Sequence, residues 1–243
     1  MNTLEYNIHS WSINTPNKTA LIAKKKSFSY KELFENIWAS KELLEIEHDI
    51  SKGDIVILAA NKNVAFVFNY FALHLIGATV LPIDEKINQD RFKFILDKAS
   101  PKLIIGLENK INSIKVIEFD CFVDLKLSRV PSNISFPKLD DNADILFTTG
   151  TTGEPKGVIL SHRNITQSAN NINSFIGNNH KDTELLAMPI SHSFGLARLR
   201  CVLSVGGTLV LLGSIVNMKR MFRMFDEYKV TGIGLVPASW SYI

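Results

Sequence analysis

Threonine, glycine and lysine side chains gather between two apolar segments, inside the stretch from Ile145 to Ile159. Glycine lets the backbone bend sharply and approach a ligand closely. Threonine hydroxyls and free backbone N–H groups can surround phosphate oxygens, and Lys156 adds a mobile positive charge. The combination predicts a loop that binds a polyphosphate. The residues assigned to this task are Thr148, Thr149, Gly150, Thr151, Thr152, Gly153 and Lys156.

The loop differs from the commoner phosphate loop, which reads G-x-x-x-x-G-K-[ST] and runs directly into a helix. Here Gly157 follows Lys156, so no hydroxyl stands in the magnesium-binding place, and Pro155 restricts the backbone before the lysine. Val158 to Leu160 favours a strand rather than a helix. A P-loop kinase or ATPase is therefore disfavoured. The remaining alternative is a threonine-rich β-turn that binds nothing.

The run Thr148-Thr-Gly-Thr-Thr-Gly-Glu-Pro-Lys-Gly157 resembles the phosphate-loop signature of the adenylate-forming acyl-CoA synthetase family. That family includes acyl and aryl ligases, luciferases and peptide-synthetase adenylation domains. Weaker landmarks of the family stand in the expected order along nearly the whole chain. They are Pro16–Leu21, Phe28–Leu33, Leu75–Asp84, Met188–Gly195 and Val230–Pro237.

The resemblance implies an enzyme that activates a carboxylic acid with ATP and Mg²⁺, forming an acyl-adenylate and pyrophosphate. A thiol, from coenzyme A or from the phosphopantetheine arm of a carrier protein, would then accept the acyl group. It also implies that Lys156 and His192 are catalytic. His192, Phe194 and Gly195 would border the acid. Without the resemblance, a histidine in Ser-His-Ser is more often a turn or cap residue.

Three other charged or titratable residues could belong to a site. His162 follows Ser161 and is expected to be a surface residue at a helix start. Arg198 and Arg200 stand in an otherwise apolar stretch and could meet an anionic group of the substrate. Pairing with nearby acids, or extension to the surface, is the favoured interpretation for both arginines.

Apolar strand-like runs alternate with helical stretches throughout the chain, which predicts an α/β fold with mainly parallel sheets flanked by helices. Helices are expected at about 30–47, 64–76, 89–98, 163 onward, 194–204 and 217–228. Strands are expected at 54–60, 79–83, 102–106, 144–149, 157–160, 184–188, 208–212 and 231–236. Ser29 with Glu32 forms a capping box for the first helix.

The pattern breaks between Cys121 and Asn142, where prolines and an acidic cluster indicate a connecting loop. This suggests a first subdomain over 1–139 and a second over 140–243. The resemblance implies that the two subdomains abut, with the active site between them.

Bulk composition excludes several classes. The net charge of +3 is too small to argue for nucleic acid, and Lys24–Lys26 is expected to be a hairpin turn. Cys121 and Cys201 have no metal or redox spacing, so reduced thiols in the cytoplasm are expected and no metal site is predicted. Val64 to Ile83 is long and apolar, but a helix followed by a strand explains it better than a membrane span.

The chain stops at Ile243, before the family's adenine-binding, ribose-binding and C-terminal lysine motifs. We therefore expect an amino-terminal fragment that is inactive alone, incomplete at its C-terminal end and able to self-associate through apolar surface around Val236 and Trp240. The alternative is a non-catalytic module that binds an acyl group or a nucleotide. Neither the acid nor the acceptor is identified by the sequence.

Overall fold

The computed structural model describes residues 1–23, 26–61, 63–107, 114–126, 129–148, 155–212 and 218–237. Within the chain there are two compact units. One comprises Met1 with Glu35–Ile165, and the other combines Asn2–Phe34 with Thr166–Ile243. Lys24, Lys25 and Trp240 lie outside the described residues. Self-association around Val236 stays a prediction.

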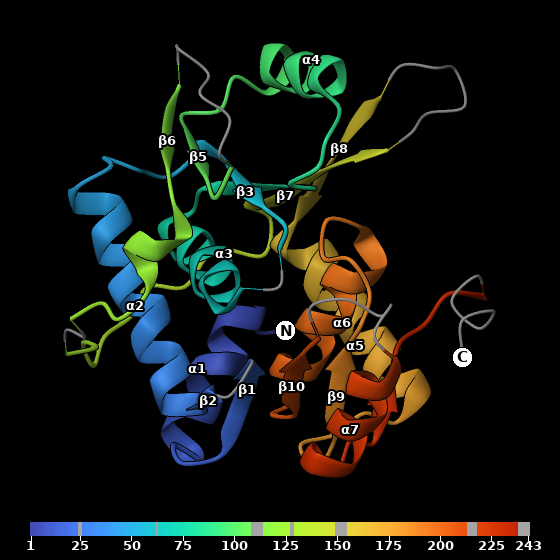
Figure 1. Cartoon of the computed structure of the whole chain (residues 1–243). Coiled ribbons are helices and arrows are strands. Elements are labelled where there is room, and N and C mark those ends of the chain that lie inside the picture. Colours follow the sequence, from blue (N-terminus) through green and yellow to red (C-terminus); the bar gives the residue numbers. More distant parts are fainter. Residues whose placement is uncertain are drawn as a thin grey trace. The chain divides into compact units, whose positions relative to one another are not determined.

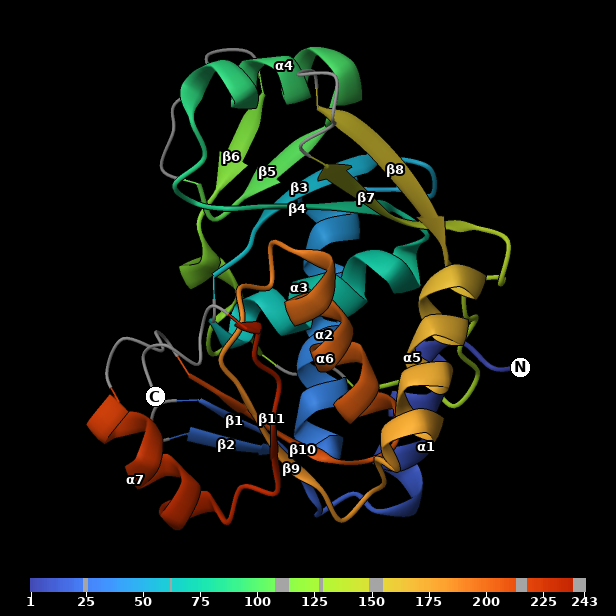
Figure 2. The same cartoon turned by 90° about the vertical axis from the view of Figure 1, so that its right-hand side faces the viewer.

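The first unit is built on a sheet with the strand order β6-β5-β3-β4-β7-β8, in which only β8 runs antiparallel to its neighbour. Helices α3 and α4 lie on opposite faces of this sheet (Figure 2). The element bounds are β3 Ile55–Ala59, α3 Val64–Ile76, β4 Thr79–Ile83, α4 Gln89–Ala99, β5 Leu103–Ile105, β6 Lys115–Ile117, the 3-10 helix η1 Phe119–Phe122, β7 Asn142–Thr148 and β8 Lys156–Ser161.

The long apolar segment from Val64 to Ile83 forms helix α3 followed by strand β4. Asn63 caps the start of α3 by accepting a hydrogen bond from the backbone N–H of Ala65 at 3.1 Å. Gly77 ends it in the left-handed conformation, at φ 86°. Strand β4 follows at Thr79 and is buried along its whole length. Among the described helices, none is long and apolar enough to cross a membrane.

A buried carboxylate ties α3 to β7. Asp144 on β7 accepts a hydrogen bond from the Tyr70 hydroxyl at 3.0 Å, and its other oxygen lies 3.3 Å from Nε2 of His74. All three side chains are fully buried. His162, predicted at the surface, is also fully buried, with its ring centroid 4.8 Å from that of His74. That expectation was wrong because α5 begins with its first side chain turned into the core.

The second unit has a sheet with the strand order β11-β9-β10-β1-β2, in which β2 runs antiparallel to β1 and the other pairs are parallel. Its helices and most of its strands are labelled in Figure 1, and β11 is labelled in Figure 2. The element bounds are α1 Leu4–Asn14, β1 Thr19–Ala23, β2 Lys26–Ser29, α2 Tyr30–Ile46, α5 His162–Ile176, β9 Thr183–Leu186, α6 Ser193–Ser204, β10 Thr208–Leu211, α7 Met218–Tyr228 and β11 Gly232–Ile233; α2 and α5 run across the boundaries of the units.

The predicted capping box is confirmed at the start of α2. The backbone N–H of Ser29 donates to the Glu32 carboxylate at 2.7 Å, and the Glu32 N–H donates back to the Ser29 hydroxyl at 3.2 Å. Ser161 and Asn164 make the same reciprocal pair at α5. These local signals explain why both helices begin where the sequence predicts.

Helix α1 was missed because its apolar side chains do not follow a clear helical stripe. It is held by buried Leu4 and Ile8, and by Trp11, whose indole N–H donates to the Ser204 carbonyl at 3.2 Å. Gly206, at φ 80°, lets the Trp11 ring lie against the backbone, since an added Cβ would stand 2.5 Å from that ring. The contact depends on tertiary packing.

The predicted division at 139/140 differs from the two units. Strands β7 and β8 complete the sheet of the first unit, and β1 pairs with β10, placing Leu21 opposite Leu209. The segment 121–142, expected to be a loop, is preceded by β6 and includes part of η1. Loop composition marks a change of local structure, whereas unit boundaries follow from long-range strand pairing.

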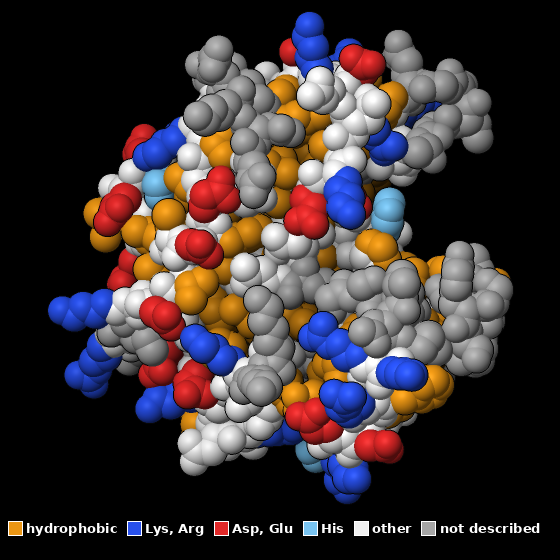
Figure 3. Space-filling model, viewed as in Figure 1, with side chains coloured by type: hydrophobic (Ala, Val, Ile, Leu, Met, Phe, Trp, Pro, Cys, Tyr) orange, Lys and Arg blue, Asp and Glu red, His pale blue; other side chains and the backbone are white. Residues whose placement is uncertain are grey.

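On the face shown in Figure 3, lysine and arginine side chains lie among aspartate and glutamate side chains. This mixture agrees with the net charge of +3. An extended surface of one sign, which nucleic-acid binding would favour, is not visible on that face.

Gly106 offers a test of packing in the first unit. It has φ 79°, and an added Cβ would stand 2.1 Å from the Phe119 ring, whereas Gly53, at φ 91°, has open space. We expect Gly53→Ala to cost about 1 kcal/mol of unfolding free energy from the backbone alone. Gly106→Ala should cost about 2 kcal/mol more through the clash. Urea denaturation checks this, and equal losses would contradict the role of Phe119.

Candidate active site

The predicted phosphate loop joins β7 to β8. Thr148 lies opposite Lys156 in the strand register, and both side chains are exposed. The Thr148 hydroxyl donates to the Lys156 carbonyl over 3.5 Å, which is a long hydrogen bond. Five of the predicted phosphate ligands lie outside the described residues: Thr149, Gly150, Thr151, Thr152 and Gly153. The structure therefore gives the base of the loop, with one hydroxyl and one ammonium group.

Close packing at Gly157 shapes this end of the hairpin. Phe147 and Gly157 are register partners, and an added Cβ on the glycine would stand 3.2 Å from the Phe147 ring and 3.4 Å from Ile145. Glycine thus allows the aromatic ring to lie across the facing strand. The glycine after the lysine has a packing reason here that is independent of any ligand.

The second group of predicted site residues lies at the start of α6. His192 is the N-cap residue, extended at φ −112° and ψ 152°, and its exposed side chain makes no capping hydrogen bond. Phe194 is 42% exposed, an unusual position for a large apolar side chain. Gly195 is buried, and an added Cβ would stand 2.1 Å from the Pro189 carbonyl oxygen. The glycine lets α6 begin directly against the preceding segment.

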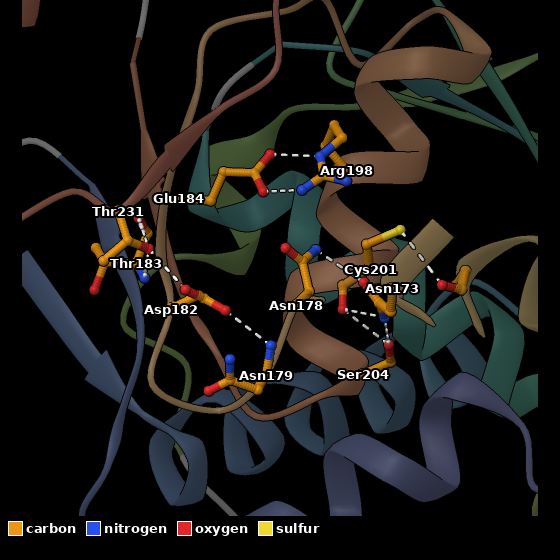
Figure 4. Close-up of polar contacts among 11 residues, drawn as sticks. Asn173, Asn178, Asn179, Asp182, Thr183, Glu184, Arg198, Cys201, Ser204 and Thr231 are labelled. Atoms are coloured by element: carbon orange, nitrogen blue, oxygen red, sulfur yellow. Dashed lines mark hydrogen bonds and ion pairs between the residues drawn. The ribbon is translucent and has the colours of Figure 1, made fainter. Parts of the chain in front are cut away.

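Arg198 lies one helical turn beyond Phe194, and its charge is neutralised inside the unit. Its Nε donates to one oxygen of Glu184 on β9 at 2.7 Å, and its Nη2 contacts the other oxygen, as Figure 4 shows. Burial alone lowers the pKa of Arg198, but the bond to Glu184 outweighs it and the net shift is upward. The favoured interpretation is confirmed for Arg198, which pairs with an acid. Arg200 is buried too.

Polar contacts bind α6 to its neighbours at its other end (Figure 4). The Asn173 side chain on α5 donates to the Cys201 carbonyl at 3.0 Å and to the Ser204 hydroxyl at 3.3 Å. Burial raises the pKa of the Cys201 thiol to about 11, so this thiol stays protonated at neutral pH. Cys201 is a packing residue and not a nucleophile.

A second polar cluster in Figure 4 joins the beginnings of β9 and β11. Asp182 accepts a hydrogen bond from the backbone N–H of Asn179 at 2.8 Å and another from the Thr231 hydroxyl at 3.0 Å. Thr231 in turn accepts from the Thr183 N–H at 3.0 Å. These bonds attach the start of β11 to β9, the strand that α6 also contacts through Arg198 and Glu184.

The end of β11 approaches the two side chains of α6 discussed above. At Gly234 an added Cβ would stand 3.3 Å from the Phe194 ring and 3.2 Å from Arg198. The absence of a side chain there leaves room for the Phe194 ring. Glu184 and Gly234 were not singled out from the sequence, since their contacts join residues far apart in the chain.

Comparison with known proteins places the chain in a family. Residues 9–243 match the family described as AMP-binding enzyme, so the chain belongs to that family. It is 25% identical over 228 residues to bacitracin synthase 2 of Bacillus licheniformis, covering 92% of this chain and 9% of the synthase. The chain therefore spans less than a tenth of the length of this curated relative.

Solved structures of similar fold support the architecture. The NpsA-ThdA protein of Klebsiella oxytoca, an artificially fused adenylation-PCP di-domain, matches with a TM-score of 0.85 and 23% identity, over 97% of this chain and 48% of that one. A double mutant of o-succinylbenzoate CoA synthetase from Bacillus subtilis matches with a TM-score of 0.87 and 23% identity, over 97% and 49%. The α/β fold with mostly parallel sheets is confirmed.

The ion pair of Arg198 can be tested against a surface pair. Arg198→Met leaves the buried Glu184 carboxylate without its partner, and we expect a loss of about 3 kcal/mol of unfolding free energy. Arg163→Met removes an exposed pair with Asp140 (2.9 Å), which solvent screens, and should change the free energy of unfolding much less.

Urea denaturation measures both, and adding Glu184→Gln to Arg198→Met should restore part of the stability because the unpaired charge is removed. Equal losses of unfolding free energy from the two arginine substitutions would show that the buried ion pair stabilises the protein no more than the exposed pair does.

Proposed function

We propose that the protein activates a carboxylic acid with ATP, forming an acyl-adenylate and releasing pyrophosphate. The observation that carries this proposal is the pairing of Thr148 with Lys156 at the base of the threonine- and glycine-rich loop, in a chain of the AMP-binding enzyme family. Since the chain covers only part of its relatives, the activity belongs to the whole protein.

The chemical task is to bring two anions together and to stabilise charge on the departing pyrophosphate. Lys156 suits that task because its ammonium group is exposed at the hairpin end and can pair with a β- or γ-phosphate oxygen. The Thr148 hydroxyl is beside it and can exchange its long bond to the Lys156 carbonyl for one to a phosphate oxygen. Thr149, Gly150, Thr151, Thr152 and Gly153 are proposed to complete the phosphate site. ATP would enter as its magnesium complex, with the metal held mainly by phosphate oxygens and water.

The start of α6 is proposed to receive the acid. The exposed imidazole of His192 can donate a hydrogen bond to a carboxylate, and the exposed ring of Phe194 can bury apolar surface of the acyl group. Gly195 contributes by letting the helix begin close to Pro189. In this proposal His192 and Lys156 are the catalytic side chains.

A thiol is proposed as the acceptor of the activated acyl group. Relatives exist for both kinds of acceptor: NpsA-ThdA carries a fused PCP, and the succinylbenzoate enzyme is a CoA synthetase bound with OSB-NCoA. Of the two, we propose the phosphopantetheine arm of a carrier protein, which the adenylation-PCP fusion supports. We place this reaction in the cytoplasm, where both cysteines, which form no disulfide, would stay reduced.

Lys156 is the direct test of the phosphate site. We expect Lys156→Ala in the whole protein to lower acid-dependent ATP–pyrophosphate exchange about a hundredfold, because a charge that stabilises the leaving group is lost. Lys138→Ala, which removes another exposed lysine of the same unit, should leave exchange unchanged. Exchange at the normal rate in Lys156→Ala would remove this lysine from the mechanism.

His192 is tested through the acid rather than the nucleotide. His192→Ala should raise the KM for the acid about tenfold while changing the KM for ATP less than about twofold, since one hydrogen bond to the carboxylate is lost. His180→Ala, in an exposed turn of the same unit, is the matched control. Steady-state kinetics over a panel of acids would also identify the preferred substrate. Equal changes in both KM values would contradict the assignment.

A further inference from the structure

Arg91, from another part of the first unit, contacts the strand that leads into the predicted phosphate loop. It lies in the first turn of α4, where Asn88 caps the helix by accepting from the backbone N–H groups of Asp90 (2.9 Å) and Arg91 (3.3 Å). The guanidinium Nη2 then donates to the Phe147 carbonyl on β7, over 3.4 Å. The helix start thus directs a long cationic side chain toward β7.

The electrostatic surroundings of Arg91 differ from those of the paired arginines. Arg163 is bound by both carboxylate oxygens of Asp140, at 2.9 and 3.1 Å, and Arg198 is bound by Glu184. Arg91 is partly buried, yet within the described part of the chain no carboxylate forms an ion pair with it. A partly buried guanidinium with five donors gains most from an anion that accepts two of them.

The position of the Phe147 carbonyl shows where such an anion could meet Arg91. Phe147 directly precedes Thr148, and the facing strand carries Gly157 and Lys156 at the same two levels. Successive strand residues are about 3.3 Å apart, and an arginine side chain is longer than that step. The Arg91 guanidinium, which comes from α4, therefore lies against β7 at the base of the loop, one residue before Thr148.

We propose that Arg91 is a second cation of the phosphate site, which binds the pyrophosphate part of ATP together with Lys156. This inference rests on the proposed function. The two cations would have different tasks: Lys156 acts as a mobile point charge, whereas the planar fork of Arg91 can hold two oxygens of one phosphate in a fixed orientation. The bond to the Phe147 carbonyl orients the fork and leaves its other donors for the ligand.

The test uses inorganic pyrophosphate as the probe and the full chain as the protein. Isothermal calorimetry should show that Arg91→Met weakens pyrophosphate binding about tenfold, because charge-assisted hydrogen bonds are lost while the aliphatic part of the side chain is kept. Arg91→Lys should show an intermediate loss, since the charge stays but the fork does not. Lys93→Ala, an exposed charge on the same helix, should bind like the unaltered chain.

The outcomes separate this inference from the proposed function. If Lys156→Ala loses pyrophosphate binding while Arg91→Met does not, the phosphate site stands and the role of Arg91 is overturned. If the unaltered chain does not bind pyrophosphate, the phosphate site and the role of Arg91 both fall. Thermal unfolding separates the loss of a ligand contact from the loss of folded structure. Reduced binding by Arg91→Met at an unchanged melting temperature supports a contact with the ligand. A loss of binding that only follows a lower melting temperature would overturn it.

Discussion

The buried carboxylate of Asp144 is the interaction on which the first unit depends most. A polar group in a protein interior is tolerated only when it is hydrogen-bonded, and here Tyr70 and His74 from α3 contact the two oxygens of Asp144. Asp144 also stands opposite Val80, where β7 joins the parallel part of the sheet. The same residue therefore fixes β7 to the helix beneath it and to the neighbouring strand.

This anchoring explains how an exposed loop can have a defined base. Strand β7 carries Thr148 out of the core, and β8 returns with Lys156 after the loop. Helix α4, on the face opposite α3, adds a cation through Arg91 (Figure 2). A rigid, buried strand that ends in a polar loop is how many α/β proteins present binding groups, since the core provides the precision and the loop provides the chemistry.

In the second unit, close packing and an ion pair fix the position of α6. Its first turn has to lie very close to the backbone at Pro189, which Gly195 allows, and its buried arginine needs a counter-charge, which Glu184 supplies. Gly195 and Arg198 are three residues apart, so both requirements act on the same side of the helix, near its start. His192, at the exposed start, makes no capping hydrogen bond with its side chain, so its position follows from packing further along the helix.

Local signals in the sequence determined most of the secondary structure and the family. Caps at Ser29 and Ser161, and the Gly77 stop, act over a few residues, so the helices they bound could be predicted. The threonine- and glycine-rich loop with Lys156 indicated the family for the same reason, because its chemistry is contained in ten consecutive residues.

Contacts between distant residues had to come from the tertiary structure. The tertiary structure shows that β1 pairs with β10 within one unit and that His162 is buried against His74. It also shows that Glu184 neutralises the charge of Arg198. Arg91 and Phe147 are 56 residues apart, and no spacing rule connects them. Strand order and charge pairing are set by the burial of the whole chain, whereas caps and turns are set by neighbours, which is why only the latter could be predicted from the sequence.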